Sequence, residues 1–372
     1  MKLSSVEEEL RATSRKLPTD PAMQALKAHC YANVSNIMPD LPKAQYDKLL
    51  MDAYHNTLCC HYEEADIGIV ESLETCFEGS NPLDRDRPPR IFVTFHFGSY
   101  RLINALLIKN GIKFKTLTIT GFILSSQAQY QQNFDILAAQ YQFPYGMEIL
   151  DAKNPKILFE IIRAVKDGYS IVIFQDGNAG TDGITEDNKN LQNVNFLNRE
   201  LKARKGVAYM SYLTKAPVAP LLIPRVGNKY VAYFLREIKP EENEEREDYC
   251  DRLLKTLYGN LEKYVQLYPA QWDGWFNLQK YIVKGSRTDT MVKFEPEKAF
   301  HFNNKGFIPF KDKQEHFLLD IVTYNAIEIS EPLLQALCES EGEDLSGLFD
   351  LSDRDTLELV ERLYEYEVLV QG

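Results

Sequence analysis

The spacing of apolar residues predicts helices in the N-terminal part of the chain. Between residues 20 and 77, apolar side chains recur at three- and four-residue steps, as they do on one face of an α-helix. The clearest run consists of Leu49, Leu50, Ala53, Tyr54 and Leu58. The segment SNPLDRDRPPR, at 80–90, has no apolar periodicity and is expected to be a loop.

From residue 91 the pattern alternates between strands and helices. Short continuous apolar runs, typical of buried strands, occupy 91–95, 114–121, 147–152, 169–176, 217–224 and 229–238. Helical spacing occupies 101–111, 125–142, 155–168, 202–216 and 243–267. A polar loop is expected at 177–190. This alternation predicts an α/β fold with a mixed, largely parallel sheet flanked by helices.

The last part of the chain, 285–372, has a different pattern. Residues 300–310 have hairpin character around an Asn-Asn-Lys-Gly turn, and strand-like runs follow at 316–329. Ser330 and Ser352 each precede a helical run, and the second run ends in a short apolar strand. The pattern predicts a small C-terminal winged-helix α+β domain.

Charge separates the same two regions. The chain has 42 Lys and Arg against 54 Asp and Glu, a formal net charge of −12. Residues 285–372 carry 8 basic and 19 acidic side chains, whereas residues 1–284 carry 34 and 35. We therefore expect a boundary near Gly285, with an N-terminal helical part at 1–90 and an α/β core at 91–284. The acidic balance excludes a general nucleic-acid binder, because phosphate neutralisation needs a basic face.

The cysteines and the hydropathy indicate a reduced, cytoplasmic protein. The six cysteines are scattered without a C-x-x-C pair, and no stretch approaches the roughly 18 apolar residues of a membrane span. Cys59, Cys60 and His61 are consecutive, but no second ligand pair lies at zinc spacing. We interpret them as part of an amphipathic helix and expect no metal site, no disulfide and no signal peptide.

His96 is the first candidate for chemistry. It directly follows a buried strand and stands shortly before a helix, and ligands usually bind at the carboxyl ends of strands in open α/β sheets. Gly98 lets the backbone approach closely, and the helix N-terminus offers free N–H donors. We expect Gly98, Ser99 and Tyr100 to contact substrate. A capping or core histidine is the simpler alternative, but the strand–His–Gly–helix context favours a functional one.

Several segments in a fixed order carry a family resemblance. They are FVTFHFGSYRLINALL at 92–107, preceded by 32–54 and followed by IVIFQDGNAG at 171–180, by 194–223 and by YPAQWDGWFNLQKY at 268–281. Together, over about 30–283, they resemble the lysophospholipid-type acyltransferases, in particular the late (lauroyl/myristoyl) acyltransferases of lipid A biosynthesis. The resemblance implies acyl transfer without a cofactor, from acyl-CoA or an acyl-carrier protein, with His96 as general base toward a hydroxyl or amine.

The resemblance breaks at one functional position. The family motif is H-x-x-x-x-D/E, but Arg101 stands where the acid should be, and Tyr100 stands at a tryptophan position. Arginine has no acceptor and cannot orient the imidazole, and a nearby cation favours neutral imidazole while weakening it as a base. Three interpretations stay open. Asp176 replaces the acid, Arg101 binds an anion or the oxyanion, or the site is degenerate and only binds.

Other candidate residues carry structural alternatives of similar weight. Asp176 ends a buried strand, where it is either a site carboxylate or a turn-forming residue. Arg199, Lys202 and Arg204 belong to a basic cluster at the expected start of a helix. With the family's donors, such a cluster holds a phosphopantetheine phosphate or an acidic carrier face; a solvated charged turn is the alternative. Trp272 and Trp275 are interpreted as packing residues.

The C-terminal part carries a second resemblance. Its paired strands, Ser330-capped helix and final LVERLYEYEVLV, at 359–370, resemble the winged-helix peptide-recognition domains typified by PqqD. Such domains bind the leader of a ribosomally made precursor peptide as an added β-strand. A generic structural winged helix is the alternative. DNA binding is disfavoured, because residues 331–372 hold 12 acidic and 2 basic side chains.

Together these features predict an acyltransferase-like tailoring enzyme of ribosomal peptide or related natural-product biosynthesis. Its partners would be a precursor peptide or carrier-bound substrate and an acyl thioester donor. The family's N-terminal membrane helix is not found in the sequence, so we expect a soluble acceptor. Three alternatives stay open: a diverged hydrolase or other enzyme acting on a bound peptide, a degenerate peptide-binding scaffold, and a lipid acyltransferase peripheral to the inner membrane.

Overall fold

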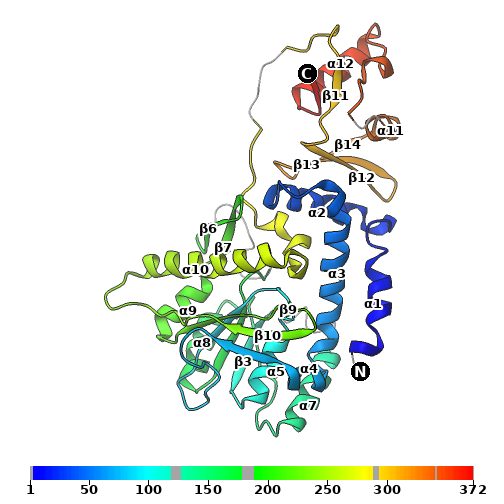
Figure 1. The fold of residues 1–372 in the computed structure, drawn as a ribbon. Helices are drawn as coiled ribbons and strands as arrows, with labels where there is room; N and C mark the ends of the chain where they lie inside the picture. The colour runs from blue at the N-terminus through cyan, green and yellow to red at the C-terminus, as the bar shows by residue number, and fades with distance from the viewer. Residues whose placement is uncertain (1–2, 119–126, 178–187, 288–292, 340–341, 372) are drawn as a thin grey trace. The chain divides into compact units, whose positions relative to one another are not determined.

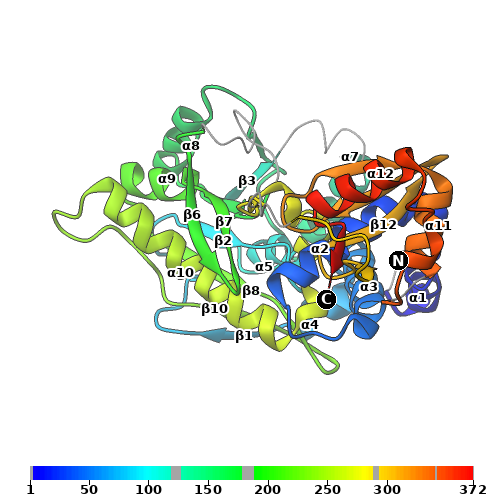
Figure 2. The same cartoon turned by 90° about the horizontal axis from the view of Figure 1, so that it is seen from above.

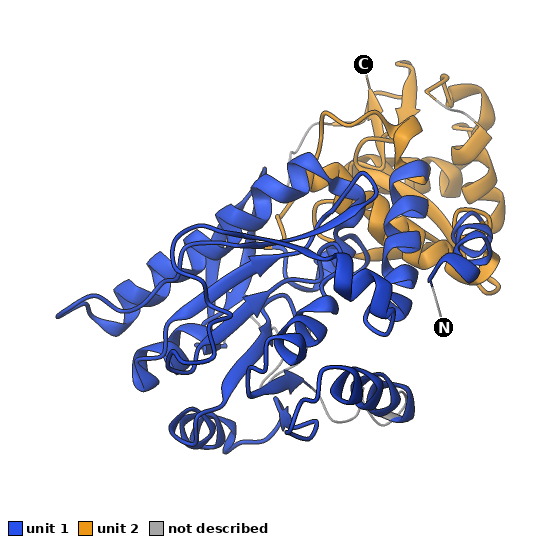
Figure 3. Cartoon of the chain, turned by 60° about the horizontal axis from the view of Figure 1, so that its bottom comes forward, with its two compact units in different colours: residues 1–15, 48–282 blue, residues 16–47, 283–372 orange. Residues whose placement is uncertain are grey.

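The chain forms two compact units. A computed structural model describes residues 3–118, 127–177, 188–287, 293–339 and 342–371. Unit 1 comprises residues 1–15 and 48–282, and unit 2 comprises residues 16–47 and 283–372 (Figure 3). Unit 2 therefore contains part of the N-terminal helical region as well as the C-terminal part.

The described elements of unit 1 alternate as expected for an α/β fold. Its helices are α1 (Glu7–Ser14), α3 (Tyr46–Glu63, whose first residues fall in unit 2), α4 (Ile67–Ser72), α5 (Leu102–Lys109), α7 (Gln127–Gln140), α8 (Ile157–Lys166), α9 (Gly206–Thr214) and α10 (Arg246–Leu267). Its strands are β1 (Glu74–Phe77), β2 (Ile91–Thr94), β3 (Phe114–Thr118), β4 (Ile149–Asp151), β5 (Ser170–Phe174), β6 (Leu191–Phe196), β7 (Arg199–Arg204), β8 (Val218–Leu222), β9 (Arg225–Val226) and β10 (Lys229–Phe234). Short 3₁₀ helices are η1 (Leu3–Ser5), η4 (Pro269–Gln271), η5 (Asp273–Phe276) and η6 (Leu278–Lys280).

One mixed sheet organises unit 1. Its described strands follow the order β1-β10-β8-β2-β5-β3-β4, and β9 pairs with β10. Only the pairs of β10 with β8 and with β9 are antiparallel; the others are parallel. Central β2 and β5 run side by side with Thr94 opposite Phe174, so both strands end at the same edge. This sheet confirms the predicted mixed, largely parallel α/β fold.

Helices cover both faces of the sheet (Figures 1 and 2). The connections through α5 and α7 step along the sheet toward β4, whereas those through α8 and α9 step back toward β8. Because such parallel crossovers are right-handed, the two pairs of helices lie on opposite faces. The contacts agree, since α5 packs with α7 and α8 packs with α9.

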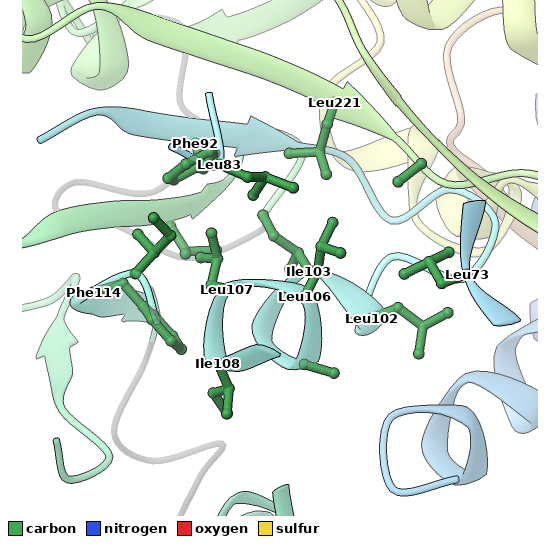
Figure 4. Close-up of a cluster of buried hydrophobic side chains, with 14 of the residues drawn as sticks. Leu73, Leu83, Phe92, Leu102, Ile103, Leu106, Leu107, Ile108, Phe114 and Leu221 are labelled. Atoms are coloured by element: carbon green, nitrogen blue, oxygen red, sulfur yellow. The ribbon is translucent and has the colours of Figure 1, made fainter. Parts of the chain in front are cut away.

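The main core lies between α5 and the sheet. The sequence of α5, LINALLIK, is apolar on nearly all sides, and six of its eight residues are buried. Figure 4 shows its leucines and isoleucines gathered with Phe92 of β2 and Leu221 of β8. A helix buried this way is held in position by packing, so the turn before it, which carries His96, is held in position too.

The structure corrects two local predictions in unit 1. Residues 74–77, expected to be helical, form the edge strand β1, which pairs with β10. Residues 191–204 form the β6–β7 hairpin, which the sequence analysis did not predict, and α9 begins at Gly206 and not at residue 202 as expected. In this hairpin buried Val194, Phe196, Leu201 and Ala203 alternate with polar residues. Most of the expected loop at 177–190 lies outside the described residues.

Unit 2 contains two small antiparallel sheets and three α-helices among its described residues. The strands are β11 (Phe300–Phe302), β12 (Phe307–Asp312), β13 (Glu315–Asp320), β14 (Ala326–Ile329) and β15 (Leu369–Gln371). The helices are α2 (Gln24–Ile37), α11 (Glu331–Glu339) and α12 (Arg354–Glu365), with the 3₁₀ helices η2 (Pro21–Met23), η3 (Lys43–Gln45) and η7 (Ser346–Leu348). Helix α2 packs on β12 and β13.

Strand pairing in unit 2 differs from the expected hairpin at 300–310. Strand β11 pairs with the C-terminal β15, whereas β12 pairs with β13 and β13 with β14. The turn at 303–306 therefore joins two different sheets. The two sheets still share one core, in which Phe300, Phe302 and Phe307 are buried. Ser330 caps α11 as predicted, accepting from Leu333 N at 3.4 Å. Across the described residues of both units, no helix combines the length and apolarity needed to cross a membrane.

Candidate active site

The turn between β2 and α5 is fixed by its backbone. Gly98 N donates to Gln271 O and Ser99 N donates to Ile223 O, both at 2.7 Å. Gly98 has φ +62°, and a Cβ there would lie 2.1 Å from Ile223 O. Only glycine satisfies both conditions. Gly98 therefore lets the backbone pass closely, as predicted, but the closely approached group is the chain just after β8.

His96 and Asp176 lie side by side at the ends of β2 and β5. The imidazole Nδ1 is 2.7 Å from Asp176 Oδ1, and the His96 backbone N–H donates to both carboxylate oxygens at 3.1 Å. The Asp176 side chain is 8% exposed and the His96 side chain 33%. The carboxylate is thus held in place while the imidazole stays accessible. The structure supplies the geometric condition for Asp176 to replace the family acid.

The environment of His96 favours its protonated form. Burial by itself would lower the pKa of the imidazole, but the adjacent Asp176 charge and hydrogen bond outweigh it, so the pKa of His96 is raised. The weakening expected from the neighbouring Arg101 cation is a smaller effect. His96 is therefore a stronger base than the sequence indicated. Its ring packs against Tyr100 and Phe174, with centroids 4.9 and 5.1 Å apart.

Arg101 forms a separate buried ion pair. Its Nη1 lies 3.6 Å from Glu64 Oε1, and both side chains are 7% exposed. Glu64 Oε1 also accepts from Asn133 Nδ2 at 3.0 Å, and the guanidinium lies 4.9 Å from the centre of the Tyr130 ring. Burial raises the pKa of Glu64, and Arg101 opposes this shift. The position of the family acid is thus occupied by a cation with its own carboxylate partner.

A second buried carboxylate, Asp273, adjoins the histidine. Its backbone N donates to His96 O at 2.9 Å, and its Oδ1 accepts from Thr57 Oγ1 at 2.7 Å. Burial raises its pKa to about 6. Trp272 and Trp275 on either side are fully buried, as expected of packing residues. The sequence analysis missed Asp273 and Glu64, because no local spacing links α3 or η5 to the turn at His96.

A cavity of about 430 Å³ opens beside His96. This volume is within the range of about 300–1,000 Å³ that is typical of small-molecule sites. Its polar lining includes His61, Glu64, His96, Tyr100, Arg101, Asn104, Tyr130 and Asn133. Its apolar lining includes Ala105, Ile108, Phe114, Phe134, Leu137, Met147, Ile149 and Phe174. Of the predicted substrate contacts in the turn, Tyr100 lines this cavity, whereas Gly98 and Ser99 are not among its lining residues.

The basic cluster is placed differently from the prediction. Arg199, Lys202 and Arg204 lie on strand β7 and not at a helix start. Lys202 and Arg204 line a space of about 10 Å³ next to Asp176, to which Arg199 does not contribute. Such a space holds about one water molecule. The structure therefore brings two of the three basic residues near the site carboxylate but outside the large cavity.

The arrangement defines a class of site. A histidine with a carboxylate partner, at the carboxyl ends of parallel strands and beside a partly apolar cavity, suits proton abstraction next to a bound acyl chain. The sequence agrees with this class: residues 86–281 match the model of the bacterial lipid A biosynthesis acyltransferases. The match covers more than half of the chain, and the protein belongs to this family.

Other comparisons are distant. No curated protein matches the sequence significantly. Among solved structures, the chain is similar to the 1-acyl-sn-glycerophosphate (LPA) acyltransferase PlsC from Thermotoga maritima, with 16% sequence identity and a TM-score of 0.33. That similarity covers 67% of this chain and 97% of the other.

Proposed function

We propose that the protein transfers an acyl group from a thioester donor, acyl-CoA or an acyl-carrier protein, to a hydroxyl or amine. The proposal rests on the His96–Asp176 pair, in which 2.7 Å separate Nδ1 and Oδ1, and on the partly apolar cavity beside it. Membership of an acyltransferase family supports the reaction class. The apolar lining favours a fatty chain over a short acyl group, because only a long chain buries that surface.

The proposed mechanism starts from neutral His96. Asp176 accepts the Nδ1 proton and thereby fixes the tautomer in which Nε2 is the base. Nε2 takes the proton from the acceptor hydroxyl or amine as that group attacks the thioester carbonyl carbon. When the tetrahedral intermediate collapses, the C–S bond breaks, and the imidazolium returns its proton to the leaving thiolate. Asp176 stabilises the imidazolium between these two steps.

The proposed roles of the basic residues follow from their partners. The charge of Arg101 is already opposed by Glu64, so its use as an oxyanion contact is weakened, and its position in the cavity wall favours contact with the acyl chain. Lys202 and Arg204, next to Asp176, are proposed to hold the anionic part of the donor, and Arg199 extends the same strand. Phosphate or a carrier's acidic face is the chemistry that suits them.

For the acceptor we propose a peptide that is recognised by unit 2. Strand β14 ends the three-stranded sheet, and its residues are partly or fully exposed. An added strand would find free backbone groups at such an edge. The acidic character of residues 331–372 suits a peptide with basic residues. The PqqD-like resemblance of this part supports the same proposal.

A lipid acceptor is the second candidate. It is favoured by the family itself, whose description names lipid A biosynthesis. In that case the enzyme would work at a membrane surface through peripheral contact. Co-sedimentation with anionic vesicles separates the two candidate acceptors, because acyl transfer to a peptide does not require membrane binding.

The test is intact-mass analysis of both acceptor classes after incubation with acyl-CoA and acyl-carrier donors of several lengths. With the wild type we expect one of the two acceptors to gain the mass of an acyl group. With His96→Ala we expect no such gain. His55→Ala removes a histidine of α3 that does not line the cavity, and this variant should behave as wild type. Thioester hydrolysis without transfer would favour the diverged hydrolase. Tight peptide binding without any chemistry would favour the scaffold and overturn the proposal.

A further inference from the structure

Helix α3 contributes a second imidazole to the cavity that adjoins His96. Thr57, His61 and Glu64 follow one another at steps of four and three residues, and all three line this cavity. Thr57 and His61 belong to α3, and Glu64 comes directly after its last residue. Side chains at this spacing lie along one face of a helix. His61 is therefore in the middle of a polar stripe, about one turn from each of its two neighbours.

Both ends of this stripe are attached to the chain around the turn after β2. At one end, Thr57 Oγ1 donates to Asp273 Oδ1 at 2.7 Å, and the backbone N of Asp273 donates to His96 O at 2.9 Å. At the other end, Glu64 Oε1 lies 3.6 Å from Arg101 Nη1. The imidazole in the middle of the stripe is therefore held against the same turn, on the wall of the same cavity.

His61 is accessible, and its ring is not engaged by the protein. The residue is exposed, and its ring has no hydrogen-bond or ion-pair partner in the part of the chain that the structure describes. Neighbouring donors of the wall are already used, since Thr57 Oγ1 donates to Asp273 and Asn133 Nδ2 donates to Glu64. A neutral imidazole has one N–H donor. On this part of the wall, that donor is available to a ligand.

The two imidazoles of the cavity have opposite electrostatic environments. The cavity walls take the His61 ring partly out of water, and this burial, followed by the Arg101 cation, lowers the pKa of His61 to about 4. Arg101 also acts on His96, but there Asp176 outweighs burial and the pKa is raised. Titratable groups whose pKa values are pushed apart in one site take different roles. His96 is suited to accept a proton, whereas His61 stays neutral and keeps its N–H.

We propose that His61 is a second catalytic residue, whose neutral imidazole donates a hydrogen bond to the thioester carbonyl oxygen as negative charge develops there. This inference rests on the proposed acyl transfer. The oxygen becomes negative when the acceptor attacks the carbonyl carbon, and it becomes neutral again when the C–S bond breaks. The N–H proton stays on His61 throughout. Arg101 leaves this role open, because Glu64 already opposes its charge.

The experiment measures kcat and KM for cleavage of a long-chain acyl-CoA by thiol release. This readout counts transfer and hydrolysis alike, and both pass through the same oxyanion. In His61→Ala we expect kcat to fall about 10²- to 10³-fold with little change in KM, because the lost contact forms in the transition state. His61→Gln keeps an N–H donor and should recover part of this loss. His55→Ala, on the same helix but outside the cavity lining, should keep the wild-type values.

A pH–rate profile separates this role from two alternatives. The charges that act on His96 belong to Asp176, Asp273 and Arg101. None of them is removed in His61→Ala, so the rising limb of kcat/KM should stay at the wild-type pH. A higher KM with unchanged kcat would make His61 a binding residue and overturn the inference. Loss of the limb, without recovery in His61→Gln, would make His61 the base and overturn it too.

Thiol release also separates this inference from the proposed function. If the wild type cleaves the thioester but acylates no acceptor, the proposed transfer fails, and a kcat loss in His61→Ala still upholds the inference. An active wild type with an unchanged kcat in His61→Ala overturns the inference alone. A wild type that cleaves no thioester overturns both. If His61→Ala does not fold, His61→Leu replaces it: a kcat well below that of His61→Gln upholds the inference, and equal values overturn it.

Discussion

At the residue scale, one hydrogen bond sets both the tautomer and the basicity of His96. Asp176 raises the pKa of the imidazole, because its charge stabilises the imidazolium. In Asp176→Asn the pKa of His96 should therefore fall. The base would be neutral at lower pH, so the rising limb of kcat/KM against pH should move to lower pH. The plateau should drop about 10²- to 10⁴-fold, because a weaker and less oriented base remains.

The measurement is a full pH–rate profile of both enzymes with one donor and acceptor. Asp167→Asn, an exposed carboxylate after α8, provides a matched control that should leave both the limb and the plateau in place. A limb that stays at the wild-type pH in Asp176→Asn would show that another group controls the titration. Asp273, whose pKa of about 6 lies close by, would then be the first to test.

The sequence was sufficient to predict two residues of this site but not their buried neighbours. His96 and Asp176 each follow a continuous apolar run, and adjacent parallel strands end at a common edge, so their proximity could be predicted. The partners Glu64 and Asp273 could not be predicted. Glu64 follows the end of α3 and Asp273 begins η5, and their approach depends on packing between segments far apart in the chain. The same holds for the partnership of Arg101 with Glu64.

At the element scale, the junction of β2 with α5 depends on Gly98. A methyl group there would meet Ile223 O at 2.1 Å and Ile223 C at 2.7 Å, both in the backbone, and φ is +62°. Gly98→Ala should therefore lower the free energy of unfolding by about 3 kcal/mol or more. Gly111→Ala, at φ +69° with no atom within 4 Å, carries only the conformational strain and should cost about 1–2 kcal/mol. Denaturant unfolding of both variants measures the difference, and equal losses would contradict the role assigned to the close approach.

The elements differ in how far their sequences reveal them. Strands β2, β5 and β8 are buried on both faces, so each is a continuous apolar run that stands out. Strand β1 at the sheet edge is exposed throughout, and nothing in ETCF separates it from a helix end. In β6 and β7 the buried residues alternate with Asn, Lys and Arg, but each alternating run is only six residues long, and the end of β7 was taken for a helix start.

At the scale of the whole molecule, unit 2 is assembled from two segments that are distant in sequence. The charge change near Gly285 marks the start of one segment, but no compositional change marks residues 16–47. The two segments are held together by hydrogen bonds and by packing. Asn36 Nδ2 donates to Ile321 O at 2.6 Å and to the Tyr324 hydroxyl at 3.1 Å, and α2 packs on β12 and β13. The helical periodicity of α2 indicates an apolar face but not its partner.

Native-state hydrogen exchange tests this assembly. If α2 belongs to unit 2, the amides of 24–37 and 307–320 should open together, as one cooperative unit. Asn36→Ala removes a donor and leaves the Ile321 carbonyl without it, so protection of both segments should fall together by about 1–3 kcal/mol. The strands at 91–94 and 170–174, in the centre of the other unit, provide an internal control and should keep their protection. If α2 keeps its protection while 307–320 loses it, the C-terminal part folds as a domain on its own, and the boundary near Gly285 is the physical one.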